Sequence, residues 1–465
     1  MTVRIRMVCC CLMPLVACAE DAPKSGDGPE SQVYVKNRCV RVGIDLRLGG
    51  AITHVSEPGG PNLINSSDLG RQIQQSYYSG PANYQREGKQ KSPNWKTFPW
   101  NPIQTGDVYH HGSKVLDHRI RDGELYVKTV PMLWPMNDDP GECVMETWIK
   151  PASDAASFTY RARLSNARAD RTHYGAHSQE VPAIYVNGPW HKLMTYNGDH
   201  PFAGEAVSEV RNDHREPWPW VRFVATEGWA ALLNDAGTGI GVCNPRVMEF
   251  HGGFAGQRGS GDEKSPNTGY MSPIANEILD HNIVYEYSCT MVLGNLEQIR
   301  AEARRVLPKT LPAWKFDESR RGFCYENGRD SGWPVAGKGL IVKAIDKTRP
   351  VRLLGPITFW RAEAAGQVAV RISSKTAGTL KVFWRGMPPP AAATAPSAWA
   401  AWQNTWWGKE RSAEAAIPVG TLQWVTLTLA GLPGYEGGLT GLAFDVPGGV
   451  TVHEVRLGGH RARKP

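Results

Sequence analysis

The sequence predicts an all-β protein in which a large antiparallel β-sandwich is followed by a smaller one. The 465-residue chain contains 49 Gly and 34 Pro, and so many turn-forming residues are typical of a protein with many short strands. Short runs that alternate apolar and polar residues recur from Gln32 onward, as expected for strands with one buried face. The length exceeds that of one ordinary domain. The composition shifts towards Ala, Val and Leu after residue 334, which predicts a second domain.

The N-terminal residues predict export. Two arginines precede an apolar run at residues 7–17, which is the pattern of a signal peptide and is too short to span a membrane. Residues 15–18, LVAC, resemble a bacterial lipobox, in which the cysteine becomes lipidated, and residues 17–19, ACA, also fit an ordinary cleavage site. We therefore expect a periplasmic or outer-membrane lipoprotein, or alternatively a secreted protein. The expected parts are a signal peptide at residues 1–18, lipidation at Cys18 and a polar tether at residues 19–31.

Residues 32–312 are predicted to form the large domain. Alternating runs such as CVMETWIKP and SFTYRARLSN follow one another here, and each predicts a strand. One helix is expected at residues 295–308, because an Asn opens this segment and a Pro closes it. Long loops at residues 84–111 and 191–219 separate the strands. Long loops in a compact domain often carry function.

A linker is expected at residues 313–333 and a second β-sandwich at residues 334–465. Runs such as QVAVRISS and TLKVFWRG predict its strands, and together they look like a small jelly-roll of the kind found in carbohydrate-binding modules. A Pro- and Ala-rich loop of this domain is rich in tryptophan. Its side chains form either a sugar platform or a wedge between the domains, and we favour the wedge. The tryptophans are Trp399, Trp402, Trp406 and Trp407.

The opening of the large domain carries a resemblance to a known superfamily. Residues 43–71, GIDLRLGGAITHVSEPGGPNLINSSDLGR, read as strand, Gly-Gly turn, strand and polar loop. This order resembles the galactose mutarotase-like β-supersandwich, a superfamily of aldose epimerases, several polysaccharide lyases and the accessory domains of many glycoside hydrolases. The resemblance implies a supersandwich over roughly residues 32–310 and a carbohydrate as the substrate class. The His-containing signatures of the epimerases have no clear counterpart here, so the resemblance assigns no catalytic residue.

Composition and motifs argue against several other classes of protein. The net charge of +7 is spread along the chain without a long run of Lys and Arg, which argues against a nucleic-acid partner. The sequence contains no P-loop, Rossmann fingerprint, G-x-S-x-G elbow or H-E-x-x-H helix. The five cysteines after the leader are scattered and predict neither a disulfide framework nor a zinc site. We expect no cofactor, although loop carboxylates leave room for a structural divalent cation, and membrane contact only through a lipid anchor.

Three polar and aromatic segments of the large domain predict a sugar-binding cleft. Residues 66–80, 98–112 and 172–202 combine amides, carboxylates, an arginine and aromatic rings. Planar polar groups satisfy sugar hydroxyls, and aromatic faces cover the C–H side of a sugar ring. The structural alternative for each segment is a loop that caps the sheet. The three expected walls are Asp68, Arg71, Gln74, Gln75 and Tyr77; Trp100 and Asp107; and His177, Glu180 and Tyr196. Gln104, beside the second wall, and Asp199, beside the third, are also expected to bind the substrate.

Hydrolysis of a glycosidic bond needs two carboxylates. We expect Glu180 to be the acid, with Asp107 or Glu146 as its partner. His177 lies three residues before Glu180, and we expect the two to form a catalytic acid/base pair whose pKa values neighbouring groups tune. Strand alternation places Glu146 on one face with Trp148, and the structural alternative for Glu146 is a solvent-facing side chain.

The sequence leaves several functions open. The favoured one is a secreted or surface-tethered glycoside hydrolase that cleaves a polysaccharide or oligosaccharide. A polysaccharide lyase that acts on a uronate would instead use Arg71, His177 and Tyr196. A non-catalytic glycan-binding lipoprotein would need aromatic platforms and no carboxylate. An epimerase is a weaker option, because a tethered protein with an extra β domain fits a polymer better than a free sugar.

Overall fold

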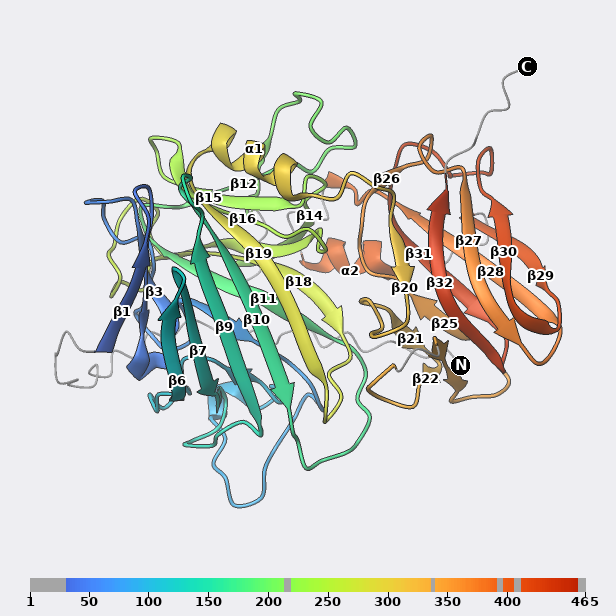
Figure 1. Ribbon diagram of the computed structural model, residues 1–465, viewed down its shortest axis with the longest axis horizontal. Coiled ribbons are helices and arrows are strands. Elements are labelled where there is room, and N and C mark those ends of the chain that lie inside the picture. The colour runs from blue at the N-terminus through green and yellow to red at the C-terminus, as the bar shows by residue number, and fades with distance from the viewer. Residues whose placement is uncertain (1–30, 213–218, 336–338, 391–395, 405–410, 459–465) are drawn as a thin grey trace.

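The structure, a computed structural model, describes residues 31–212, 219–335, 339–390, 396–404 and 411–458 (Figure 1). It confirms the all-β class, with two β-sandwich domains that lie side by side. The predicted signal peptide, Cys18 and most of the tether lie outside the described residues, so export stays a prediction. No helix in the described part of the chain is long and apolar enough to cross a membrane.

Two antiparallel sheets face each other in the large domain. The first sheet contains, in spatial order, β1 (Gln32–Lys36), β2 (Arg41–Asp45), β3 (Ala51–Ser56), β4 (Ile73–Ser76), β11 (His177–Asn187), β18 (Thr268–Glu277), β17 (Glu249–Ala255) and β14 (Trp220–Val224), with β5 (Pro102–Ile103) joined to β4 and β8 (Met132–Leu133) joined to β5. The second sheet contains β13 (Ser208–Glu209), β12 (Lys192–Thr195), β15 (Trp229–Leu233), β16 (Thr238–Cys243), β19 (Val284–Asn295), β10 (Ser157–Asn166), β9 (Cys143–Pro151), β7 (Glu124–Val130) and β6 (Lys114–Arg121). Short 3-10 turns lie at Leu46–Leu48 and Pro93–Trp95.

The hydrophobic core of the large domain fills the space between these sheets. Ile184 and Met271 of the first sheet and Met145 and Met291 of the second are all buried in it. Strand β9 shows how the pattern arises, since Met145 and its alternate neighbours are buried whereas Glu146 and Trp148 are only half-buried. The predicted division of this strand into two faces is confirmed. The core therefore separates the outward faces of the two sheets.

The predicted helix is α1 (Leu296–Val306), and its N-terminus is held by a capping box. The Asn295 side chain accepts a hydrogen bond from the Gln298 backbone N–H at 3.0 Å, and the Gln298 side chain accepts one from the Asn295 N–H at 2.9 Å. Ile299 and Ala303 face the second sheet and are buried. Capping satisfies backbone donors that have no partner inside the helix.

We expect Asn295→Ala to lower the free energy of unfolding by about 1 kcal/mol, because the capping acceptor is lost. Urea unfolding followed by circular dichroism measures this change. Asn295→Ser keeps a capping oxygen and is expected to stay within a few tenths of a kcal/mol of the parent. Equal losses in the two variants would show that the cap does not contribute.

The smaller domain is a second sandwich around its own core. One sheet contains β20 (Ala313–Lys315), β32 (Val450–Gly458), β27 (Gln367–Ser374) and β30 (Gly420–Thr428), with β23 (Leu340–Ile341) joined to β32. The other contains β21 (Cys324–Glu326), β25 (Val351–Leu354), β31 (Gly438–Val446), β28 (Gly378–Gly386) and β29 (Ser412–Ile417), with β26 (Trp360–Arg361) joined to β31. A separate pair is formed by β22 (Gly328–Arg329) and β24 (Lys343–Ala344).

Residues 313–333, predicted as a linker, are part of this second sandwich. Strand β20 pairs with β32, and β21 pairs with β25. Phe316 and Phe323 are fully buried in the core of the domain. The second domain therefore begins near Ala313. Its first strands are only two or three residues long, too short for an alternating pattern to reveal them.

The tryptophan-rich loop forms the second described helix, α2 (Pro396–Asn404), which the sequence did not predict. Trp399 and Trp402 pack against Val224 of the large domain and Ile357 of the small one. The predicted wedge is confirmed for these two tryptophans, whereas Trp406 and Trp407 lie outside the described residues. The wedge places the small domain against β14, at the edge of the first sheet.

Candidate functional site

Three residues of the first predicted wall are buried side chains that bind other protein groups. Gln74, Gln75 and Tyr77 are all buried. The Gln75 amide donates to the Thr147 hydroxyl at 2.7 Å across the core, and the Tyr77 hydroxyl donates to Gln75 at 2.8 Å. Gln74 donates to backbone oxygens of the preceding loop, including that of Arg71 at 2.6 Å. These amides attach loop and sheet to each other, so they do not face a ligand.

Asp68 and Arg71 pair with each other in this loop. The Arg71 Nε lies 3.0 Å from an Asp68 carboxylate oxygen. The same guanidinium donates to the Asn65 side chain at 3.1 Å and to the Pro266 carbonyl at 3.1 Å. Arg71 is largely buried by these contacts, and it fastens the loop before β4 to the loop before β18.

The second predicted wall is also buried. Trp100, Gln104 and Asp107 are at most 1% exposed. Asp107 accepts hydrogen bonds from the backbone N–H groups of Tyr109, His111 and Asp138 and from the His111 ring, all at 2.8–3.0 Å. A carboxylate with four such donors organises its loop. The structure thus favours the structural alternative for Asp107 over a catalytic role.

The third wall is divided among separate places. Tyr196 is buried and donates to Glu205. The His177 ring lies 3.0 Å from the Gly80 carbonyl, and burial lowers the pKa of this histidine despite that contact. Asp199 lies at the junction of the two domains, where Arg361 contacts it. Of this set, Glu180 alone lies on the outward face of the first sheet.

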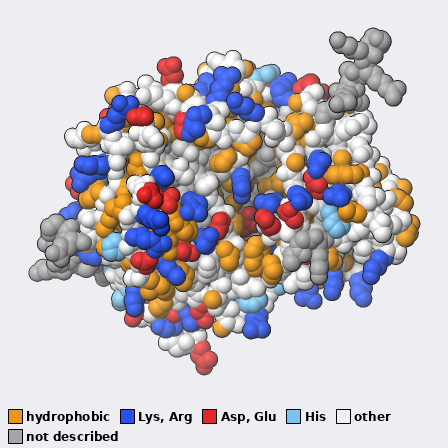
Figure 2. Space-filling model, viewed as in Figure 1, with side chains coloured by type: hydrophobic (Ala, Val, Ile, Leu, Met, Phe, Trp, Pro, Cys, Tyr) orange, Lys and Arg blue, Asp and Glu red, His pale blue; other side chains and the backbone are white. Residues whose placement is uncertain are grey.

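Glu146 lies on the opposite side of the sandwich from Glu180. It belongs to β9 and points out of the second sheet, where the Tyr126 hydroxyl donates to it at 2.7 Å and Arg163 lies 3.6 Å away. Figure 2 views this side of the molecule, on which Lys and Arg side chains lie among acidic and apolar ones. Because the core separates the two carboxylates, they do not form a catalytic pair.

Glu180 is half-buried and directly precedes an irregular step in β11. The pairing of β11 with both β4 and β18 shifts just after Glu180. Pro182 lies in this step and has no N–H to donate to a ladder, which is why such residues occur at bulges. Bulges re-aim neighbouring side chains. The Glu180 carboxylate accepts hydrogen bonds from the Tyr78 hydroxyl at 2.9 Å and from the Tyr270 hydroxyl.

Aromatic rings lie beside this carboxylate on the same face of the sheet. Ring centroids of Tyr185 and Tyr270 are 4.7 Å apart, and those of Trp220 and Tyr270 are 5.0 Å apart. The His251 ring meets Tyr270 edge-on at 5.8 Å. We call this group of side chains the Glu180 face. Trp220, Glu249 and Tyr270 are buried in it, and its other members, Tyr78, Ser178, Glu180, Tyr185, Arg222, His251 and Asn276, are half-buried.

A second carboxylate, Glu249, is held at the β17 side of the Glu180 face. Arg222 Nη1 lies 2.5 Å from one of its oxygens, and the Asn276 amide donates to the other at 3.2 Å. Arg222 also donates to the Ser178 hydroxyl at 3.0 Å, and Ser178 donates to Asn276 at 3.0 Å. Glu249 is only 2% exposed, and these contacts hold its carboxylate in place.

The strand register relates the two carboxylates. Glu180 pairs with Ile274 of β18, and Phe250 of β17 pairs with Pro273. Continuing this register by one residue places Glu249 opposite Ile274. Ile274 of β18 therefore lies between Glu180 of β11 and Glu249 of β17. Two strand spacings then separate the backbones of Glu180 and Glu249, which is roughly 10 Å.

Burial sets the protonation of the neighbouring rings. Burial, with the charge of Glu180, raises the pKa of Tyr270 well above its usual value, so this phenol keeps its proton. Burial, with the charge of Arg222, lowers the pKa of His251 to about 3, so its ring is neutral. The face therefore combines two carboxylates with a phenol and an imidazole that are both uncharged near pH 7.

Among the described residues, no group of three or more His, Cys, Asp or Glu side chains is placed to hold a metal ion. The five cysteines of the described chain are free, and three of them are buried.

The sequence did not single out most of the Glu180 face. Tyr78 directly follows predicted Tyr77 but points to the opposite side of the sheet, as alternation requires. Arg222, Glu249 and His251 lie on strands that gave no motif. The one available signal was the occurrence of polar residues within otherwise apolar strands, and that pattern does not say which strands are neighbours.

Comparisons with known proteins gave structural similarities of low identity. No protein-family model matches the chain, and no curated protein sequence matches it. Similar solved structures include a putative aldose 1-epimerase from Escherichia coli K12, with 10% identity, TM-score 0.35 and coverage of 57% of this chain and 99% of that one. A galactose mutarotase-like protein from Lactobacillus casei has 11% identity, TM-score 0.34 and coverage of 56% and 99%.

A GH36 alpha-galactosidase, AgaB, from Geobacillus stearothermophilus is similar at 9% identity and TM-score 0.35, over 61% of this chain and 43% of that one. We draw no conclusion about activity from similarities of this size. The sandwich architecture is shown by the sheets of the chain itself. The solved structures that are similar to this chain include one described as galactose mutarotase-like, in line with the resemblance that the sequence carries.

Proposed function

We propose that this protein is a carbohydrate-active enzyme that binds a sugar on the Glu180 face and cleaves a glycosidic bond. The observation that carries the proposal is the half-buried Glu180 carboxylate, which lies between two phenol hydroxyls beside Tyr185 and Trp220. Aromatic rings and hydroxyl-matching polar groups are what sugar recognition needs. The predicted export of the chain fits a polymeric substrate outside the cell.

Glu180 and Glu249 supply the two carboxylates that hydrolysis needs. Glu180 is the more accessible and transfers the proton, whereas Arg222 and Asn276 hold Glu249. Glu249 replaces Asp107 and Glu146 as the proposed partner. We infer an inverting arrangement, in which a water molecule lies between the two carboxyl groups, because the backbones that carry them are two strand spacings, roughly 10 Å, apart.

A polysaccharide lyase is the second candidate, and one observation favours it. A guanidinium, Arg222, lies on the same face as phenols that touch Glu180, so a uronate carboxylate would find a cation beside proton-transfer groups. The lyase residues are then Arg222, Tyr78 and Tyr270. The earlier set of Arg71, His177 and Tyr196 is not brought together in the structure.

A panel of polysaccharides incubated with residues 19–465 tests the proposal. New reducing ends and the ultraviolet absorbance of unsaturated uronates are read together. If the protein is a hydrolase, new reducing ends are expected without ultraviolet absorbance. Ultraviolet absorbance of the products would show instead that the protein is a lyase. Retention on a glycan gel without any product would contradict both and leave a glycan-binding protein.

A further inference from the structure

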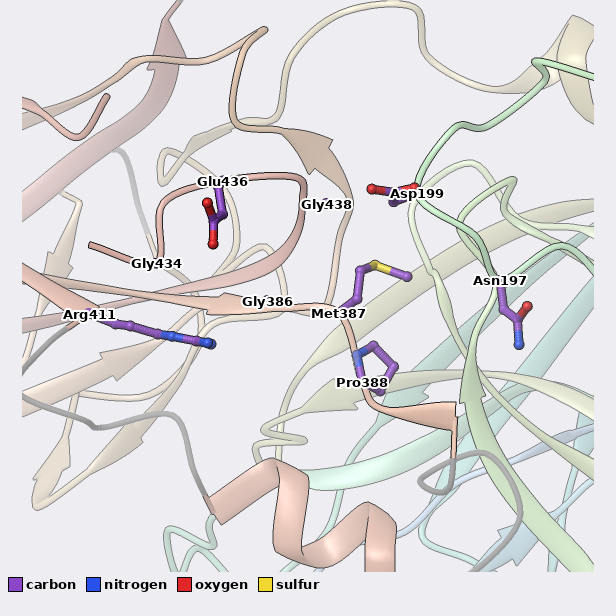
Figure 3. Close-up of a pocket in the computed structure, with 9 residues that line it drawn as sticks. All are labelled: Asn197, Asp199, Gly386, Met387, Pro388, Arg411, Gly434, Glu436 and Gly438. Atoms are coloured by element: carbon purple, nitrogen blue, oxygen red, sulfur yellow. The ribbon is translucent and has the colours of Figure 1, made fainter. Parts of the chain in front are cut away.

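An open hollow of about 420 Å³ lies at the junction of the two domains. Figure 3 shows residues of both domains facing each other across it. Asn197 and Asp199 come from the large domain, and Met387, Arg411 and Glu436 come from the small one. The volume lies within the range of small-molecule sites. The hollow is separate from the Glu180 face, since none of the residues that line it defines that face.

Contacts between the domains fix the shape of this hollow. Arg361 of the small domain donates to the Asp199 carbonyl at 3.0 Å and to its carboxylate at 3.3 Å. A Cβ on Gly438 would lie 2.8 Å from the Asp199 Cβ and 2.9 Å from Met387 Cγ. Glycine at position 438 therefore allows the close approach of the two walls.

Two charged side chains on the small-domain wall are available to a ligand. Within the described residues, neither Arg411 nor Glu436 has an ion-pair partner, and both are exposed. The Arg411 side chain lies beside the backbones of Gly434 and Gly386, so that the glycines leave room for it. Asp199 adds a carboxylate that is 39% exposed.

The chemistry of the lining selects a class of ligand. Guanidinium, carboxylate and amide groups offer both donors and acceptors, which suits hydroxyl groups. Met387 and Pro388 give an apolar surface between them for C–H groups. The Asp199 carboxylate is already paired with Arg361, so one guanidinium, Arg411, and one carboxylate, Glu436, remain for a ligand, and this balance of charge suits a neutral ligand. We propose that the junction is a second carbohydrate-binding subsite, which takes a neutral oligosaccharide.

This proposal rests on the proposed function only for the choice of carbohydrate as the ligand class. Isothermal titration with maltohexaose, cellohexaose, xylohexaose and hexagalacturonate tests it, with the two-domain protein carrying Glu180→Gln so that no substrate is consumed. At least one neutral hexasaccharide is expected to bind. Arg411→Ala and Asn197→Ala are expected to weaken that binding about tenfold, the effect of one lost hydrogen bond to a charged or amide group.

Arg349→Ala is the matched control, because Arg349 is an exposed arginine of the same domain that does not line the hollow. It is expected to leave the affinity unchanged. Any of three results would overturn the subsite. These are equal affinities in all three variants, tighter binding of hexagalacturonate than of the neutral hexasaccharides, and no binding of any neutral hexasaccharide. If the wild-type protein cleaves a polysaccharide but Arg411→Ala does not weaken oligosaccharide binding, the subsite is wrong and the proposed function stands. If Arg411→Ala weakens binding but the wild-type protein releases no product, the subsite stands and the proposed function is wrong.

Discussion

Glu180→Gln is expected to lower kcat on the polysaccharide by about 10²-fold to 10⁴-fold, the usual contribution of a positioned acid or base. The substitution removes the titratable oxygen but keeps the size and one hydrogen-bond acceptor of the side chain. Tyr78 and Tyr270 still have a partner at this position, so the fold is expected to be retained. Initial rates of reducing-end release, with circular dichroism and thermal unfolding on the same samples, measure both effects.

Glu146→Gln is the matched control for this prediction. Glu146 is also a half-buried strand carboxylate that accepts a tyrosine hydroxyl, here from Tyr126. It lies on the outward face of the other sheet, so its substitution is expected to leave kcat within about twofold of the parent, an effect below 0.5 kcal/mol. Full activity in Glu180→Gln, or an equal loss in Glu146→Gln, contradicts the assignment of the site.

Arg320→Met is expected to lower the free energy of unfolding by about 3–5 kcal/mol, because it leaves two buried carboxylates without their cation. Arg320 is 2% exposed and contacts Asp280 of the large domain and Asp330 at 2.6 Å each. Its guanidinium contacts Asp330 through a second nitrogen at 2.7 Å. Arg320 thus joins the small domain to the end of β18. Urea unfolding measures the loss.

The neighbouring Arg321 provides the control for Arg320→Met. Its side chain is 32% exposed and reaches Asp317 at 3.3 Å. Arg321→Met is expected to cost less than about 1 kcal/mol, as surface ion pairs do. A similar loss in the two variants would show that the buried Arg320 network stabilises the fold no more than the surface ion pair of Arg321 does.

The pH dependence of Arg320→Met follows from the carboxylates. Burial opposes ionisation of Asp280, but a hydrogen bond from His173 and the Arg320 charge outweigh it and lower its pKa. For Asp330, burial is likewise outweighed by hydrogen bonding and charge from Arg320, and its pKa is lowered. Groups whose folded-state pKa is lowered stabilise the fold above their unfolded pKa, and that stability is lost as pH falls through the folded pKa. The gap between parent and variant is therefore expected to be widest near pH 7 and to narrow below about pH 4.

The sequence predicted the elements of this fold better than the relations among them. The faces of β9, the start of α1 at Asn295 and the docking of Trp399 all follow from local patterns of side chains. The strands of the predicted linker were missed, because a segment as short as β21 has too few residues to show an alternation of apolar and polar side chains. Sequence polarity identified Asp107 but could not show that its carboxylate faces backbone N–H groups rather than solvent.

The candidate site could be predicted only in part, because its members are distant in sequence. Glu180, Tyr270, Glu249 and Arg222 lie on β11, β18, β17 and β14, which are neighbours in space but not in chain order. Such an order depends on long-range pairing that no local motif encodes. Glu180 itself was found because it lies in a dense polar and aromatic segment.

A crystal structure of the Glu180→Gln protein with an oligosaccharide of the cleaved polysaccharide tests the central claim most directly. We predict a sugar ring within hydrogen-bonding distance of the side chain at position 180, with a ring face against Tyr185 or Trp220. A sugar bound instead beside Glu146 on the outer face of the second sheet, or a Glu180 face left empty at a saturating concentration, would contradict it.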